Sequence, residues 1–202
     1  MILMSFLDLI YPKKCLGCSK AGKYFCDECL KTVKLNDQAS LIGTSLFRYE
    51  GIIKQAIQTL KYQFLRNIEG ELGGLIERGV VEEELKEFLQ LKPLVQPIPL
   101  YWRRQNWRGF NQAEIIGKVV ADKFNLKMTD YLVRVKPNKP QADLKRKERL
   151  ENVKNIFAIK GKPAGAILVV DDVWTTGATM REAINTFKKS GVKKVWGLTL
   201  AR

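Results

Sequence analysis

The chain has no histidine among its 202 residues, which excludes imidazole both as a general base and as a metal ligand. Any acid–base step therefore falls to Asp, Glu, Lys or Tyr side chains, or to a substrate. Long apolar runs are also missing, because no stretch approaches the about 20 residues that a membrane-spanning helix needs. Acidic residues are outnumbered, 21 against 35 Lys and Arg, and the formal net charge is +14. This charge favours phosphorylated or polyanionic partners without choosing between a nucleotide and a nucleic acid.

The first eleven residues, MILMSFLDLIY, are apolar enough to raise the question of a signal peptide. However, Asp8 interrupts them, no basic residue precedes them, and no small-residue cleavage site follows. We therefore expect a short amphipathic helix here, and a soluble, cytoplasmic protein with no membrane span. With 46% hydrophobic residues, the chain can bury one substantial core and carry a small additional module.

Cysteine is confined to one short window. It forms two CxxC pairs separated by seven residues: Cys15, Cys18, Cys26 and Cys29. Such pairs make tight knuckles, eased here by Gly17, and four thiolates can converge on a tetrahedral Zn²⁺ with no position left for water. We therefore predict a structural zinc ion in a zinc-finger-like module of residues 1–40. The alternatives are two disulfides, which a reducing cytosol disfavours, and a redox-active CxxC, which lacks a thioredoxin-like context.

The most informative stretch is AILVVDDVWTTGAT, residues 166–179. Its apolar run at 167–170 is typical of a parallel strand buried on both faces, and we expect this strand to stop at the acid pair that follows. A loop rich in Thr and Gly then opens a helix, so that backbone N–H groups face one point at the positive end of the helix dipole. The pattern predicts a phosphate site formed by Thr175, Thr176, Gly177, Ala178 and Thr179.

The acid pair needs an explanation, because two carboxylates repel a phosphate. At the end of a strand, Asp171 and Asp172 suit the 2- and 3-hydroxyls of a ribose 5-phosphate. The segment resembles the phosphoribosyl pyrophosphate (PRPP) motif of type I phosphoribosyltransferases, in which an apolar strand leads to Asp-Asp and Thr-Gly-x-Thr. The resemblance implies that the two acids hold the ribose and that the loop holds the 5-phosphate, although Trp174 replaces a smaller aliphatic residue. The alternative is a simple corner whose acids cap the helix.

A second corner of the same kind lies earlier in the chain. Residues 94–98 read as a strand ending at Pro99, and the basic stretch WRRQNWRGF at 102–110 leads to an amphipathic helix that begins near Asn111. A strand, a basic glycine-bearing loop and a helix predict another phosphate-facing site. Two alternatives remain open: a surface loop whose tryptophans pack on the cysteine module, and a contact with single-stranded DNA through arginines and stacking tryptophans.

The RGFNQ block at 108–112 resembles the signature of the ComF family of phosphoribosyltransferase-like proteins, which includes competence proteins. The order of features also matches that family: four cysteines, Lys61-Tyr62, this block, a basic loop and the PRPP motif. The resemblance therefore runs over about residues 15–202. It implies that pyrophosphate is bound by Arg108, Gly109 and the backbone of Phe110.

Residues 134–162 contain ten basic and three acidic residues and so supply half of the excess positive charge. We expect strands at 128–135 and 153–160 with a basic segment between them. Pro137 and Pro140 argue against regular structure at its start, whereas LKRKERLENV at 144–153 is compatible with a short helix. By resemblance, this segment corresponds to the loop that closes over PRPP and sets a cation against the departing pyrophosphate. The candidate cations are Lys145, Arg146 and Arg149. For each of them, a solvated loop position or an outer nucleic-acid contact is the alternative.

The remaining patterns predict a strand at 45–50, a helix at 51–65, a helical stretch at 67–91 with a weak point at Gly73-Gly74, and a last strand at 193–202. Strand–helix alternation predicts an α/β fold over residues 41–202, with a Rossmann-like, mainly parallel sheet flanked by helices. Ligands are expected at the carboxyl ends of its strands.

The resemblance implies a type I phosphoribosyltransferase, in which a nucleophile displaces pyrophosphate from C1 of PRPP and Mg²⁺ is held by the pyrophosphate, the ribose hydroxyls and water. Asp171, Asp172 and Arg108 would be catalytic, through sugar positioning and leaving-group stabilisation. Thr175 stands where 6-oxopurine-salvage enzymes have an acid, which argues against hypoxanthine or guanine as the acceptor. By the same resemblance, the leading context is DNA uptake in natural transformation. The second hypothesis is a non-catalytic competence factor that keeps the fold and binds single-stranded DNA or competence-machinery proteins.

Overall fold

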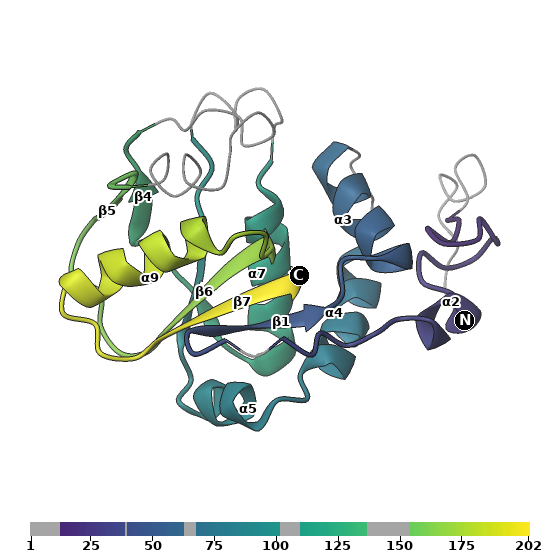
Figure 1. Ribbon diagram of the computed structural model, residues 1–202, viewed down its shortest axis with the longest axis horizontal. Coiled ribbons are helices and arrows are strands. Elements are labelled where there is room, and N and C mark those ends of the chain that lie inside the picture. Colours follow the sequence, from purple (N-terminus) through teal and green to yellow (C-terminus); the bar gives the residue numbers. More distant parts are fainter. Residues whose placement is uncertain (1–12, 39, 63–67, 102–109, 137–153) are drawn as a thin grey trace.

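The structure is a computed structural model that describes residues 13–38, 40–62, 68–101, 110–136 and 154–202 (Figure 1). Its centre is a five-stranded sheet in the order β1-β7-β6-β2-β3, in which all neighbouring strands are parallel. These strands are β1 (Gly43–Phe47), β2 (Leu94–Pro97), β3 (Lys127–Met128), β6 (Ile167–Val173) and β7 (Val195–Ala201). The expected α/β class with a mainly parallel sheet is confirmed.

Helices cover both faces of this sheet. One face packs against α3 (Gly51–Tyr62), α4 (Ile68–Gly79), α5 (Glu83–Gln90) and α7 (Gln112–Phe124), and the other packs against α9 (Ala178–Lys189). Leu168 and Val170 of β6 point into the first core, whereas Ile167 and Val169 point into the second. Because side chains alternate along a strand, a strand covered on both faces must be apolar throughout.

The strand β6 does not stop at the acid pair, so that expectation was wrong. It continues to Val173, because Asp171 and Val173 still pair with Thr199 and Ala201 of β7. Asp171 and Asp172 are half-buried at this carboxyl end of β6. The following helix α9 begins at Ala178, which places the last two loop residues in its first helical turn.

The single strand expected at 128–135 was also wrong, because this region contributes to two sheets. After β3 the chain leaves the main sheet, and β4 (Leu132–Arg134) pairs antiparallel with β5 (Phe157–Ile159). The buried side chain of Gln96 accepts the backbone N–H of Leu132 at 3.0 Å, which fixes the start of β4 next to β2. The later of the two expected strands corresponds to β5.

The helical stretch expected over 67–91 is two helices, and the break falls at residues 80–82 rather than at Gly73-Gly74. The end of α4 packs closely on β1, since a Cβ on Gly79 would lie 2.7 Å from Cζ of Phe47. Glu83 and Glu84 occupy the first turn of α5, where negative charge stabilises a helix start. Sequence spacing did not reveal this close contact.

The strands expected at 45–50 and 193–202 are confirmed as β1 and β7, with ends shifted by a few residues. The helix expected at 51–65 is confirmed as α3 up to Tyr62, and the rest of that range lies outside the described residues. Before β1, the cysteine region contains the short helix α2 (Asp27–Lys31). The amphipathic helix expected at the start of the chain lies outside the described residues. Among the helices that the structure describes, none is both long and apolar enough to cross a membrane.

Candidate functional site

The carboxyl ends of β2 and β6 meet at one edge of the sheet (Figure 1). The N–H of Ile98 donates to the carbonyl of Val170 at 2.8 Å, so the pairing continues just past β2. Asp171 and Asp172 follow, and both are half-buried. The N–H of Asp172 donates to Oδ1 of Asp171 at 2.9 Å, and the N–H of Val173 donates to Oδ1 of Asp172 at 2.7 Å. The predicted acid pair therefore stands where open parallel sheets bind ligands.

The segment between β6 and α9 is rich in hydrogen-bond donors. Gly177, directly before α9, has φ +72°, a left-handed conformation that glycine adopts without strain. Thr175 is exposed, while Thr176 and Thr179 are half-buried. The N–H of Ala178 donates to Oγ1 of Thr176 at 3.3 Å, and the first turn of α9 contains no acidic residue. The amino end of this 12-residue helix therefore suits an anionic ligand.

Trp174 lies buried beside this segment with 3% of its surface exposed. Its backbone N–H donates to the carbonyl of Ala201 at 2.8 Å, which ties the loop to the end of β7. A Cβ on Gly177 would lie only 2.3 Å from the indole nitrogen, so no other residue fits there without a shift. The guanidinium carbon of Arg202 is 5.9 Å from the centroid of the indole ring. The aromatic residue at this position therefore shapes the loop that the sequence pattern predicts as a phosphate site.

Asn111 and Gln112 fasten the second corner, at the amino end of α7. Oδ1 of Asn111 accepts the N–H of Ala113 at 3.1 Å, and its side-chain amide donates to the carbonyl of Ile98 at 3.0 Å. The amide of Gln112 donates to the carbonyl of Leu60 in α3 at 3.3 Å. Both side chains are buried, so they position α7 against β2 and α3. The sequence motifs did not predict these contacts, although an Asn before a helix is a recognised N-cap signal.

The two predicted corners are thus joined by hydrogen bonds from Asn111 to Ile98 and from Ile98 to Val170. Phe110 precedes the α7 corner and is half-buried. Five predicted ligands lie outside the described residues: Arg108, Gly109, Lys145, Arg146 and Arg149. Their contacts with pyrophosphate therefore stay a prediction. Residues 108 and 109 lie between β2 of the main sheet and α7, whereas the later three lie between β4 and β5 of the two-stranded sheet.

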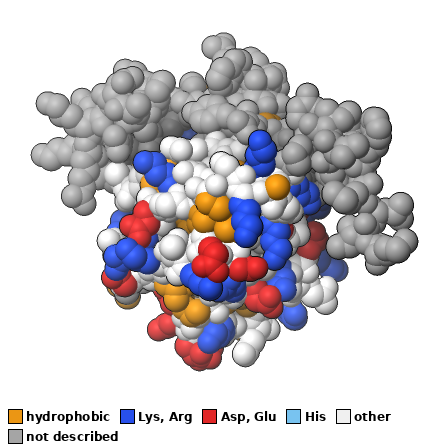
Figure 2. Space-filling model, turned by 90° about the vertical axis from the view of Figure 1, so that its right-hand side faces the viewer, with side chains coloured by type: hydrophobic (Ala, Val, Ile, Leu, Met, Phe, Trp, Pro, Cys, Tyr) orange, Lys and Arg blue, Asp and Glu red, His pale blue; other side chains and the backbone are white. Residues whose placement is uncertain are grey.

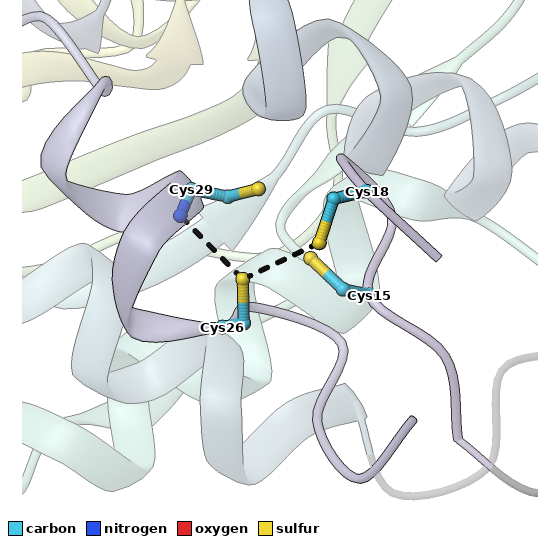
Figure 3. A group of neighbouring side chains, drawn as sticks. All are labelled: Cys15, Cys18, Cys26 and Cys29. Atoms are coloured by element: carbon cyan, nitrogen blue, oxygen red, sulfur yellow. Dashed lines mark hydrogen bonds between the residues drawn. The ribbon is translucent and has the colours of Figure 1, made fainter. Parts of the chain in front are cut away.

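The four predicted cysteines converge, with all their sulfur atoms within 4.8 Å of one another (Figure 3). Sγ of Cys18 lies 3.6 Å from Sγ of Cys26, which also accepts the N–H of Cys29 at 3.5 Å. Sulfur atoms around a tetrahedral Zn²⁺ are about 3.8 Å apart when each Zn–S distance is about 2.3 Å. The cluster fits such a site, and no disulfide joins these four cysteines.

The thiols of this cluster differ in acidity. Burial raises the pKa of Cys15, but hydrogen bonds from the backbone of Cys26, Cys18 and Gly17 outweigh it and lower the pKa to about 6. The hydrogen bond with the sulfur of Cys26 and then burial raise the pKa of Cys29 to about 12. Four thiols this close together do not all ionise unaided, and a divalent cation supplies the compensating charge.

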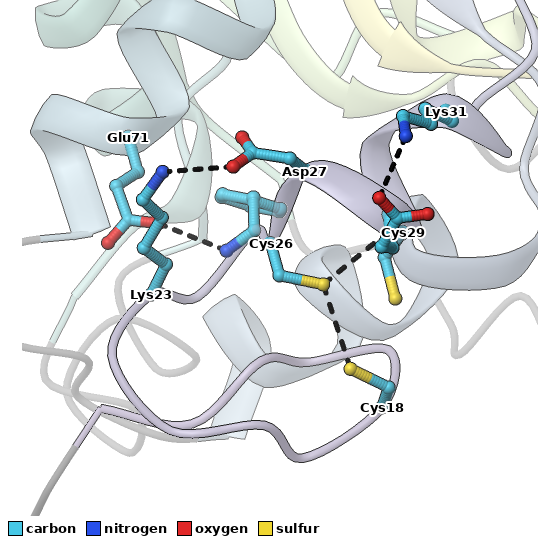
Figure 4. A network of polar contacts seen from close by, with 9 residues as sticks. Cys18, Lys23, Cys26, Asp27, Cys29, Lys31 and Glu71 are labelled. Atoms are coloured by element: carbon cyan, nitrogen blue, oxygen red, sulfur yellow. Dashed lines mark hydrogen bonds and ion pairs between the residues drawn. The ribbon is translucent and has the colours of Figure 1, made fainter.

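The cysteine region is packed against the helices of the sheet domain. The N–H of Phe25 donates to Oε2 of Glu71 on α4 at 3.0 Å (Figure 4). Cys15, Tyr24 and Phe25 also belong to the core that contains α3 and α4. The region's outer side carries two ion pairs, Lys23–Asp27 at 3.4 Å and Lys31–Glu28 at 2.7 Å. The cluster is therefore continuous with the main core, while the division into modules at residues 1–40 and 41–202 stays a prediction.

Several known proteins are similar to this chain in sequence. No family model matches the chain. Competence protein F of Haemophilus influenzae is 32% identical over 197 residues, which cover 93% of this chain and 84% of that protein. The DNA utilization protein YhgH of Escherichia coli strain K12 is 28% identical and covers 74% of this chain and 68% of its own length. For the competence protein ComFC of Bacillus subtilis, the identity is 27%, with 78% and 63% covered.

Among solved structures, the allosteric regulatory enzyme of purine biosynthesis matches with a TM-score of 0.42 and 13% identity, over 71% of this chain and 30% of that one. The sequence relationship is the stronger finding, because the match to Competence protein F extends over most of both chains. It agrees with the resemblance to the ComF family that the sequence motifs of this chain indicate. The chain belongs to the ComF family, with Competence protein F, ComFC and YhgH as its relatives.

Proposed function

We propose that this protein binds PRPP with Mg²⁺ at the carboxyl edge of β2 and β6 and transfers its phosphoribosyl group to an acceptor. The observation that carries the proposal is an acid pair at the end of β6 that is followed, after residues 173–177, by the start of α9, whose first turn has no acid of its own. A ribose 5-phosphate needs hydrogen-bond acceptors for its hydroxyls and donors for its phosphate. Residues 171–179 offer both in one continuous segment.

In this proposal, Asp171 and Asp172 hold the ribose hydroxyls, and the loop from Thr175 to Thr179 holds the 5-phosphate. Pyrophosphate is bound by the RGF block of residues 108–110 and is faced by the basic residues of the later loop: Lys145, Arg146 and Arg149. As the bond from C1 to the pyrophosphate oxygen breaks, the aspartates favour the positive charge that develops on the sugar. The cations favour the negative charge on the leaving group. Mg²⁺ bound with PRPP supplies further neutralising charge.

The four-cysteine cluster has a separate, structural role in this proposal. With four protein thiolates, Zn²⁺ has no open position for a substrate or a catalytic water. Because Cys15 and Phe25 share a core with α3, zinc would stabilise the helix whose carboxyl end Gln112 holds against α7. The metal therefore supports the pyrophosphate corner from a distance.

The names of the relatives support a biological context in DNA uptake or use. Two of them are named competence proteins and one is named a DNA utilization protein. We propose that phosphoribosyl transfer, or PRPP binding, serves that process in this chain as well.

A second candidate function is binding of single-stranded DNA without catalysis, which the net charge of +14 favours. On the side of the molecule that carries α2, however, Lys and Arg side chains are interspersed with Asp and Glu (Figure 2). DNA binding would then depend on the basic stretches at 102–108 and 134–162. Binding of a fluorescent oligonucleotide that weakens steeply with added salt would support this function, since released counterions make such binding salt-dependent.

The test of catalysis is release of pyrophosphate from PRPP. Zinc-loaded protein is incubated with Mg²⁺, PRPP and fractions of a small-molecule cell extract, and pyrophosphate is measured. We expect one fraction to stimulate release by the wild type but not by the Asp171→Asn/Asp172→Asn variant, which keeps the shape and loses the charge. Equal release by both proteins, or no release with any fraction, would contradict the transferase and leave the binding function as the candidate.

A further inference from the structure

The indole N–H of Trp174 is a buried hydrogen-bond donor without an acceptor in the part of the chain that the structure describes. The side chain is 3% exposed, so bulk solvent hardly reaches it. Leaving a buried donor unsatisfied is costly, and native proteins rarely do so without a reason. By contrast, the indole N–H of Trp196 in β7 has an acceptor, because its Nε1 donates to Oγ1 of Thr44 at 3.2 Å.

The position of this donor is specific. The indole nitrogen lies 2.3 Å from the ideal position of a Cβ on Gly177, and Gly177 immediately precedes α9. The first N–H groups of any helix lack partners within the helix, and here only Ala178 has a side-chain partner among the described residues. A buried indole N–H and free backbone N–H groups therefore gather at one helix start, and all of them are donors.

The charged groups around this point favour an acceptor that carries negative charge. Arg202 stacks near the indole ring, and one guanidinium nitrogen of Arg181 lies 3.4 Å from the carbonyl of Thr176. The acids nearest in sequence, Asp171 and Asp172, each accept a backbone N–H of the next residue. Glu182, further along α9, accepts the N–H of Asn155 at 2.6 Å. The first turn of α9 itself contains no acid.

We infer that Trp174 is a phosphate-binding residue whose indole N–H donates to a phosphomonoester held at the amino end of α9. The inference rests on the proposed function, since the phosphate is the 5-phosphate of the ribose-phosphate ligand, and it adds a donor that a smaller aliphatic residue cannot supply. The inference also gives a second reason for glycine at position 177, besides its left-handed backbone. A side chain there would occupy the space between the indole nitrogen and the helix start.

The direct test is a nuclear magnetic resonance titration of zinc-loaded, ¹⁵N-labelled protein with ribose 5-phosphate, with inorganic phosphate and unphosphorylated ribose as parallel titrants. Each indole N–H signal is assigned by the loss of one peak in a Trp→Phe variant. We expect the Trp174 proton to move downfield and to exchange more slowly with water when a phosphate-bearing titrant is added. Ribose alone should leave it unchanged, and the signal of Trp196 should not respond to any titrant.

Affinity provides the second measurement. Trp174→Phe keeps an aromatic ring in the core but removes the N–H together with part of the indole ring, and loss of the donor should weaken ribose 5-phosphate binding by roughly tenfold to a hundredfold. The matched control is Trp196→Phe, which removes an indole N–H whose partner is Thr44 and should leave that affinity unchanged. If Trp174→Phe does not fold, the Trp174 signal is still assigned by elimination from the other three Trp→Phe variants.

The outcomes separate this inference from the proposed function. Ribose 5-phosphate that shifts the backbone amides of residues 177–179 but leaves the Trp174 indole unchanged would overturn the role of Trp174 alone. Unchanged affinity in Trp174→Phe would overturn it as well. If no signal of the wild type responds at millimolar ribose 5-phosphate, both the inference and the proposed ribose-phosphate site are wrong.

Discussion

The side-chain amide of Asn111 donates a hydrogen bond to the backbone carbonyl of Ile98 at 3.0 Å. These residues stand on either side of the basic loop, one at the start of α7 and the other just after β2. Since the N–H of Ile98 in turn bonds to Val170 of β6, the bond links the predicted pyrophosphate corner to the predicted ribose corner. The backbone of Ile98 therefore connects the two halves of the candidate site through hydrogen bonds.

Replacing Asn111 by Ala should lower the free energy of unfolding by about 1–2 kcal/mol, because it removes the N-cap of α7 and leaves a buried carbonyl without its partner. Urea denaturation of the zinc-loaded protein measures this change. Asn111→Asp separates the two roles, since it can still cap the helix but cannot donate to Ile98. A stability equal to that of the wild type in Asn111→Ala would show that the bond does not fasten the corner.

Gly17→Ala should weaken zinc binding, because a Cβ at this position would lie 2.8 Å from Sγ of Cys29 and must displace that sulfur. The control is Gly74→Ala, at an exposed position of α4 with nothing within 4 Å, where alanine should stabilise the helix by up to about 1 kcal/mol. Competition with a chromogenic chelator reports zinc affinity. Equal affinities in Gly17→Ala and the wild type would argue against a metal held by the four sulfurs.

Zinc affinity should rise with pH. Cys29 has a pKa of about 12 and keeps its proton until the metal displaces it, whereas Cys15, with a pKa of about 6, is already ionised at neutral pH. Each displaced proton makes the apparent affinity about tenfold higher per pH unit. Below about pH 6 the dependence should steepen, because Cys15 must then also lose a proton. Chelator competition at several pH values provides the measurement, and a pH-independent affinity would be inconsistent with thiolate ligands.

Gly177→Ala should destabilise the protein more than Gly165→Ala. Both glycines have left-handed backbones, with φ +72° and +78°, so alanine brings a similar backbone strain of about 1 kcal/mol at each. Only at Gly177 does the new Cβ also meet an obstacle, the indole of Trp174, while nothing lies within 4 Å at Gly165. Thermal unfolding of the two variants isolates this contact. Equal losses of stability would mean that the indole does not pack against the loop.

Local patterns were sufficient to predict the acid pair, the donor-rich loop and the cysteine cluster, because each is made of residues close together in sequence. The parallel sheet was also predictable, since a strand buried on both faces must be apolar along its length. The split of residues 128–135 between two sheets was not predictable, because it depends on the side chain of Gln96, more than thirty residues earlier.

Other features depended on contacts that spacing alone cannot show. The break between α4 and α5 follows from the packing of Gly79 on Phe47, and β6 extends past Asp171 because β7 is long enough to pair with it. The position of Trp174 under Gly177 is likewise a tertiary contact. The sequence marked Trp174 only as an unusual residue in an otherwise familiar motif.

We propose that Asp171 and Asp172 form part of a PRPP site, and calorimetric titration of zinc-loaded protein with Mg²⁺ and PRPP is the decisive measurement. Titration at two temperatures guards against a binding enthalpy that passes through zero. We expect saturable, Mg²⁺-dependent binding that is lost in Asp171→Asn/Asp172→Asn and kept in Asp130→Asn, a control at an acid paired with Lys160. No binding by the wild type up to millimolar PRPP, or equal binding by the double variant, would contradict it.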